Sequence, residues 1–261
     1  MTTENPLLAK IRMPGRIFQL PSRGLFYKNG ELDDSVKEGE IHVHPMSALA
    51  EIHMKNPDQL FSGQAVETVF RECVSGVAKP SELLSKDVDA ILMFLRTVTY
   101  GPQYEFTATH TCKDAKDHSY VADVDGMIGG MKYIDPTTVE KQYTVDMPNG
   151  QIVKLQPSRY NKIVEILKFN EGKKEISVED MKTNLMMMLT SVVVQVDDIT
   201  DPVMIREWLA KIHTKWTTQI AQRVESINEW GPSMNWTGKC RDCGEEFSVE
   251  IPINPITFFI E

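Results

Sequence analysis

The residues with the clearest chemical potential are two cysteines near the end of the sequence, Cys240 and Cys243. Two residues separate them and Gly244 follows, which is the arrangement of a zinc knuckle. The tight turn directs both sulfurs to one point, and the glycine accepts the turn geometry that brings backbone amides to the thiolates. One such pair supplies half of a tetrahedral metal site. Two further ligands therefore have to come from another segment.

The other half of the site is predicted in the middle of the chain, where Cys112 follows a strand-like segment and opens a polar turn. His118 can close the site from the far side of that turn. His110 competes with it, because residues two apart on a strand point the same way. We favour Cys112 and His118 with Cys240 and Cys243, since a knuckle places its two ligands on either side of a turn. Such a closed four-ligand site predicts structural zinc, whereas a catalytic zinc keeps an open position.

The cysteines also allow interpretations that involve no metal. A degenerate knuckle would hold packed thiols and no metal. A thioredoxin-like redox pair is disfavoured, because residues 240–243 (CRDC) do not lie between a strand and a helix. Cys73 lies on a helical apolar face beside Val69 and Phe70, which predicts a small buried core residue. The sequence holds no nucleophile elbow and no metalloprotease motif, so we predict a protein that is not an enzyme.

Three segments have to position these residues, and together they predict an α+β fold. Residues 1–60 carry tight-turn signals and short alternating runs, which predict a β-rich N-terminal segment. Residues 61–230 predict a mainly helical body with a β insertion at about 102–156. Residues 231–261 predict a zinc-knuckle module and an apolar tail. If the four ligands meet, residues 231–261 pack back on residues of about 104–124, and the two segments together form a small zinc-ribbon-like β module.

A long helix and an apolar tail are predicted in the last third of the chain. Asp201 and Pro202 begin a long apolar stripe that runs to Ile227, and the stripe predicts one long helix. The tail at 254–260 (NPITFFI) can dock into a partner or pack on its own domain, and the sequence leaves both roles open.

The composition limits the classes of partner. The 261 residues carry a net charge of -9, which opposes a broad electrostatic grip on nucleic acid or on an anionic membrane. No apolar run approaches the ~20 residues that span a bilayer. The first residues lack the layout of a signal peptide, so we expect a cytoplasmic protein. Disulfides are rare in the cytoplasm, so we expect its cysteines to be reduced.

Several blocks resemble a family of phage tail proteins, the baseplate hub and hub-assembly proteins of T-even-type contractile-tailed bacteriophages. The blocks are residues 20–27 (LPSRGLFY), 40–47 (EIHVHPMS), 83–96 (LLSKDVDAILMFLR) and 99–101 (TYG). The segments around Cys112 and from 240 to 259 also fit this family, while residues 137–195 resemble it least.

The resemblance implies a non-enzymatic role in building, or forming part of, the central hub of a contractile tail. It implies other phage tail and baseplate hub proteins as partners, in an oligomer or hetero-complex, without a membrane and without direct contact to nucleic acid. It also implies a location in the virion tail baseplate, reached from the host cytoplasm during assembly. The family's central cysteine position resembles a two-cysteine knuckle, whereas here Cys112 and the later His118 stand in its place.

Two alternatives follow from the cysteines alone. The first is a zinc-ribbon factor associated with nucleic acid or a polymerase, which predicts a basic face near the ribbon. Lys239 and Arg241 are offset there by Asp242, Glu245 and Glu246, so the sequence opposes this alternative. The second is a metalloenzyme, which would need an open metal position and a nearby general base.

Overall fold

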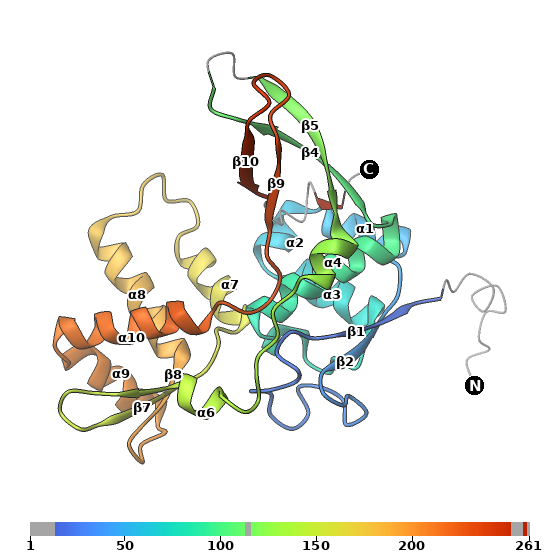
Figure 1. The fold of residues 1–261 in the computed structure, drawn as a ribbon. Helices are drawn as coiled ribbons and strands as arrows, with labels where there is room; N and C mark the ends of the chain where they lie inside the picture. The colour runs from blue at the N-terminus through green and yellow to red at the C-terminus, as the bar shows by residue number, and fades with distance from the viewer. Residues whose placement is uncertain (1–13, 113–115, 252–257, 260–261) are drawn as a thin grey trace, which may run out of the picture.

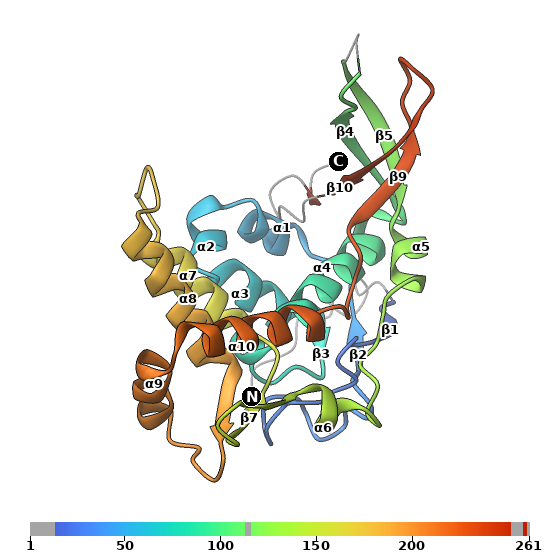
Figure 2. The same ribbon diagram turned by 60° about the vertical axis from the view of Figure 1, so that its left-hand side comes forward.

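The structure, a computed structural model, describes residues 14–112, 116–251 and 258–259. Helices and antiparallel strands share the fold, which confirms the predicted α+β class. The strands form four small sheets, and Figures 1 and 2 show a helical body from which two β-hairpins project. No helix in these described ranges is long and apolar enough to cross a membrane.

The first sheet joins three strands from the beginning of the chain. Strand β1 (Arg16–Gln19) pairs antiparallel with β2 (Glu40–Val43), and β2 pairs with the short β3 (Val74–Ser75). In β2 the side chains of Ile41 and Val43 are buried and their neighbours are exposed. This alternation is the pattern of a strand with one face on the core, as the sequence predicts.

The first core surrounds α4 (Ser85–Tyr100), a helix that is buried along most of its length. Phe94 of α4 stacks on Phe18 of β1 with ring centroids 4.2 Å apart. Cys73 is also buried in this core, which confirms its role as a packing residue. The helical elements before α4 are α1 (Ala48–Met54), α2 (Pro57–Phe61), α3 (Gln64–Cys73) and the 3₁₀ helix η2 (Pro80–Glu82).

The second core lies between a small sheet and the later helices. Its sheet contains β6 (Thr144–Asp146), β7 (Ile152–Leu155) and β8 (Val193–Val196) in that order. Helices α7 (Tyr160–Phe169) and α8 (Val178–Val192) precede β8 as a helical hairpin, which lies on the left in Figure 1. The short helices α5 (Val124–Gly129) and α6 (Val139–Gln142) come before this unit in the chain.

The long helix predicted from Pro202 is wrong, because the chain forms two helices there. Helix α9 (Pro202–Lys211) ends at Ile212, which is extended with a ψ of 156°, and α10 (Thr214–Ile227) follows. His213 caps α10, since its Nδ1 accepts a hydrogen bond from the backbone N–H of Lys215. Apolar side chains of both helices still face the second core. The apolar stripe in the sequence therefore predicts the buried face correctly, but it does not predict the break between the two helices.

A buried carboxylate attaches the segment between β1 and β2 to α4. Asp87 accepts hydrogen bonds from the backbone N–H of Ser22 at 3.0 Å and from the Tyr27 hydroxyl at 2.7 Å. The Tyr27 oxygen in turn accepts a hydrogen bond from the backbone N–H of Leu84 at 2.9 Å. Burial raises the pKa of the Asp87 carboxyl to about 6 and also raises the pKa of the Tyr27 hydroxyl.

A buried arginine joins the same N-terminal segment to the start of α7. Arg159 donates to the Glu31 carboxylate at 2.9 Å, to the Glu82 carbonyl at 2.6 Å and to the Phe26 carbonyl at 2.9 Å. The side chains of Arg159 and Glu31 are each only 8% exposed, so water screens their ion pair little. Three segments that are distant in sequence therefore meet at one guanidinium group.

The two projecting hairpins lie side by side in both views (Figures 1 and 2). They are β4 (Gln103–Thr109) with β5 (Asp117–Asp123), and β9 (Asn235–Lys239) with β10 (Glu246–Glu250). Aromatic rings fill the space between them: Tyr120 lies 4.9 Å from Trp236 and 5.5 Å from Phe247, centroid to centroid. The C-terminal hairpin therefore packs against the middle β segment.

Phe258 and Phe259 are buried in the first core. The Phe258 ring lies 4.9 Å from the Tyr104 ring, and the Tyr100 hydroxyl donates to the Phe259 carbonyl at 3.2 Å. The rest of the predicted tail, residues 254–257 and 260, lies outside the described residues. Of the two roles left open for the tail, these two rings pack on the chain's own core.

Candidate metal centre

The end of β4 presents the first two candidate ligands, His110 and Cys112. Tyr104 and Ala108 of β4 are buried against the neighbouring segments, and His110 continues this alternation just beyond the strand. The backbone N–H of Cys112 then donates to the His110 carbonyl at 2.9 Å, which closes a three-residue turn. The turn brings both side chains to the tip of the hairpin.

The turn between β9 and β10 presents the other two candidates, Cys240 and Cys243. The backbone N–H of Gly244 donates to the Cys240 carbonyl at 2.9 Å, and the N–H of Cys240 donates to the Glu245 carbonyl at 2.8 Å. Gly244 has a φ of +76°, in the left-handed region that favours glycine. This geometry is the reason that the knuckle sequence requires a glycine after its second cysteine.

The two tips bring their side chains to one place. One ligand atom from each of His110, Cys112, Cys240 and Cys243 lies within 4.8 Å of the other three. The Cys243 sulfur is 3.4 Å from Nδ1 of His110. Tetrahedral zinc with Zn–S bonds of about 2.3 Å holds its sulfurs about 3.8 Å apart, so a small closure of this cluster accommodates the ion.

The chemistry of the donors also fits zinc. Three thiols and one imidazole form one of the ligand sets of structural zinc sites. Backbone N–H groups of Cys243 and Asp242 are directed at the Cys240 sulfur, and they lower the pKa of the Cys240 thiol to about 6. The thiolate is the form of cysteine that binds metal, so the turn favours the form of Cys240 that could act as a ligand. All four cysteines are free thiols in the structure.

The structure brings three of the four predicted ligands, Cys112, Cys240 and Cys243, together with His110. The fourth predicted ligand, His118, instead contacts Asp242, with Nε2 2.9 Å from Oδ2. This contact lowers the pKa of the Asp242 carboxyl. His118 pairs with Ala108 across the hairpin, two residues before His110, and this register sets it back from the tip. No local pattern predicts this contact of Asp242, which lies between the two cysteines.

Other histidines in the described residues do not form a complete metal site. The rings of His42 and His44 lie at the end of β2 with their centroids 4.4 Å apart and are tilted by 41° to each other. The described residues contain no second group of three or more histidine, cysteine or carboxylate side chains placed to hold one ion. The metal centre at the tips of the hairpins is therefore the leading candidate site within these ranges.

Comparison with known proteins gives one positive finding. A family model described as "T4 bacteriophage base plate protein" matches residues 36–259, which include the second core, both projecting hairpins and most of the first core. No curated protein matches the chain. No solved structure matches it either.

Proposed function

Because the chain belongs to the family of T4 bacteriophage base plate proteins, we propose that it builds, or forms part of, the central hub of a contractile-tail baseplate. Membership of this family gives the chain a structural role in a phage baseplate. The match over residues 36–259 is the observation that carries the proposal. In this role the protein acts through contacts with other proteins and not as an enzyme.

The proposed partners are other phage tail and baseplate hub proteins, held in an oligomer or a hetero-complex. Neither a membrane nor nucleic acid is among them. Exposed apolar side chains on α1, α8 and α9 support a role in protein contact, since such side chains often mark interaction surfaces. The proposed location is the virion tail baseplate, with assembly in the host cytoplasm.

Mass spectrometry of purified virions and of purified tail-assembly intermediates tests this proposal. We expect peptides of the chain in at least one of these particles, at a constant ratio to other baseplate proteins across the gradient fractions. Presence in virions identifies a permanent component, and presence only in intermediates identifies an assembly factor. Absence from both particles, in cells where the chain is expressed, contradicts the proposal.

We further propose that His110, Cys112, Cys240 and Cys243 hold a structural zinc ion. The support is that their ligand atoms already lie together and that a set of three thiolates and one imidazole suits zinc. Four protein ligands leave no open position for a substrate, so the ion would cross-link the tips of the two hairpins. The hydrogen bond between His118 and Asp242 would hold the same two hairpins together beside the ion.

Exchange of single ligands tests this proposal. Elemental analysis of gently purified protein is expected to give about one zinc per chain, because the four ligands form one closed site. His110→Ala, Cys240→Ser and Cys243→Ser are expected to lose the zinc and to melt at lower temperature, since metal binding contributes to folding stability. His118→Ala is expected to keep it.

Cys73→Ala is the matched control, because Cys73 is a buried thiol of the first core that lies outside the cluster. This variant should retain its zinc even if the core is less stable. Protein without bound metal would contradict the zinc proposal itself. Loss of zinc in His118→Ala with retention in His110→Ala would identify His118 as the ligand.

A further inference from the structure

Helix α8 carries an apolar stripe that is only half covered. The last turns of the stripe, Leu189 and Val192, are buried in the second core. Val178, Met181 and Leu185 continue it toward the start of the helix at spacings of three and four residues, and they are 70%, 59% and 41% exposed. The first half of α8 therefore presents the same kind of face as its second half, and the described residues cover that face only in part.

The uncovered half of α8 is held as a helix in the free chain. Ser177 and Asp180 form a capping box at its start. The Asp180 carboxylate also accepts from the Lys173 ammonium at 2.5 Å, and the Asn184 side chain accepts a hydrogen bond from that of Asn170, the residue that follows α7. Because the end of the helix is fixed, a partner would meet a formed apolar face and would not have to order it.

The charge of this region is unlike that of the whole chain. Residues 160–192, which contain α7 and α8, carry five lysines and five carboxylates, while the chain has a net charge of -9. The net charge makes two copies of the chain repel each other. That repulsion is weakest where the helical hairpin of one copy meets the helical hairpin of the other, because each is neutral.

We propose that a second copy of this chain covers the stripe, with the two α8 helices antiparallel and crossing near Met181. In a two-fold pair, residue i contacts residue j of the partner and j contacts i. Glu179 of each copy then lies opposite Lys182 of the other. Within one copy this pair is a weak surface contact, with 3.4 Å between the charged atoms and both side chains largely exposed, so both side chains are free to exchange partners.

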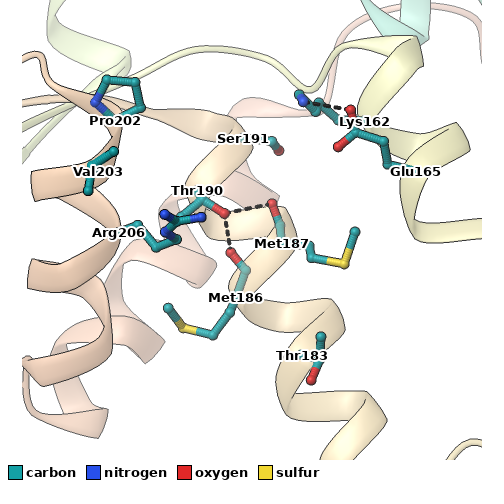
Figure 3. A pocket seen from close by; sticks show the side chains of 10 residues that line it. All are labelled: Lys162, Glu165, Thr183, Met186, Met187, Thr190, Ser191, Pro202, Val203 and Arg206. Carbon is teal, nitrogen blue, oxygen red and sulfur yellow. Dashed lines mark hydrogen bonds and ion pairs between the residues drawn. The ribbon is translucent and has the colours of Figure 1, made fainter. Parts of the chain in front are cut away.

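The opposite face of α8 supplies an internal control. There α8 forms the floor of a groove of about 390 Å³, shown in Figure 3, with Lys162 and Glu165 of α7 on one side and Val203 of α9 on the other. Met187 lies on this floor. Met181 and Met187 thus offer the same side chain on two different faces of one helix.

Sedimentation equilibrium of the isolated full chain tests the proposal. We expect the mass to rise from one to two copies between about 1 and about 200 μM, the range of weak protein contacts. Met181→Glu is expected to raise the dissociation constant at least about tenfold, because it places a charge in the centre of the contact. Met187→Glu is expected to leave the constant unchanged.

Charge reversal tests the proposed orientation. Glu179→Lys is expected to raise the dissociation constant roughly fivefold, since two symmetric surface pairs become repulsive. Adding Lys182→Glu to that variant restores both pairs and is expected to restore the constant. A mass of one copy at every concentration overturns the proposal, as does an effect of Met187→Glu equal to that of Met181→Glu. Failure of the double variant to recover overturns the antiparallel arrangement. This contact is measured on isolated protein, so its outcome is independent of the chain's place in the baseplate.

Discussion

Replacing Arg159 by Met is expected to lower the free energy of unfolding by about 3–5 kcal/mol, because the change leaves a buried carboxylate without its partner. Glu31 accepts a hydrogen bond from Arg159 at 2.9 Å, and both side chains are almost completely buried. Methionine fills a similar volume but donates no hydrogen bond. The Phe26 and Glu82 carbonyls lose donors as well, so three segments lose their common contact.

Chemical denaturation followed by circular dichroism measures this loss. The free energy of unfolding of Arg159→Lys is expected to lie between that of the native chain and that of Arg159→Met, because one ammonium group cannot reproduce the forked contacts of a guanidinium. Lys162→Met, in the first turn of the helix that Arg159 precedes, is the matched control, since the ion pair of Lys162 with Glu165 is exposed and is worth about 0–1 kcal/mol. Equal effects of Lys162→Met and Arg159→Met would contradict the importance of the buried pair.

Phe259→Ala is expected to cost about 3–5 kcal/mol, the usual range for removing a buried aromatic side chain. Phe259 is fully buried in the first core, although it lies 159 positions after Tyr100, where α4 ends. The substitution removes the ring and leaves a cavity that the surrounding helices can close only in part.

The loss is measured by thermal unfolding and by denaturant titration, which report the same cooperative transition if the core is one unit. Phe61→Ala is the control, because Phe61 lies on α2 with its ring 39% exposed. That variant is expected to change stability by only about three fifths as much, in proportion to the smaller area buried. A Phe259→Ala chain as stable as the Phe61→Ala chain would show that the last described residues do not contribute to the core.

Local patterns were sufficient for much of the fold. Helical spacing of apolar side chains indicated the helices now seen as α3 and α4, and strict alternation indicated β2. The spacing of Cys240 and Cys243, with the following glycine, indicated a tight turn that presents two thiols. These features depend on neighbours in sequence, which is why the sequence could predict them.

Other features depend on contacts between distant segments. Which of His110 and His118 lies beside the three cysteines depends on the register of β4 on β5 and on the approach of the second hairpin, neither of which has a local signal. The break at Ile212 leaves the apolar stripe intact and is therefore invisible to periodicity. The burial of Arg159 against Glu31 joins positions that are 128 residues apart, and nothing in the neighbouring residues marks either one as buried.

The two hairpins that meet at the proposed metal centre leave the ribosome at different times. Cys112 and Cys240 are 128 positions apart in the chain. At a synthesis rate of about 5–20 residues per second, roughly 6–26 s pass between them. During that interval His110 and Cys112 form only half of a coordination sphere, and the aromatic rings of the first hairpin lack their cover. The contacts at this tip can therefore form only after both hairpins have been synthesised, and the same holds for the contacts of Phe258 with Tyr104 and of Phe259 with Tyr100.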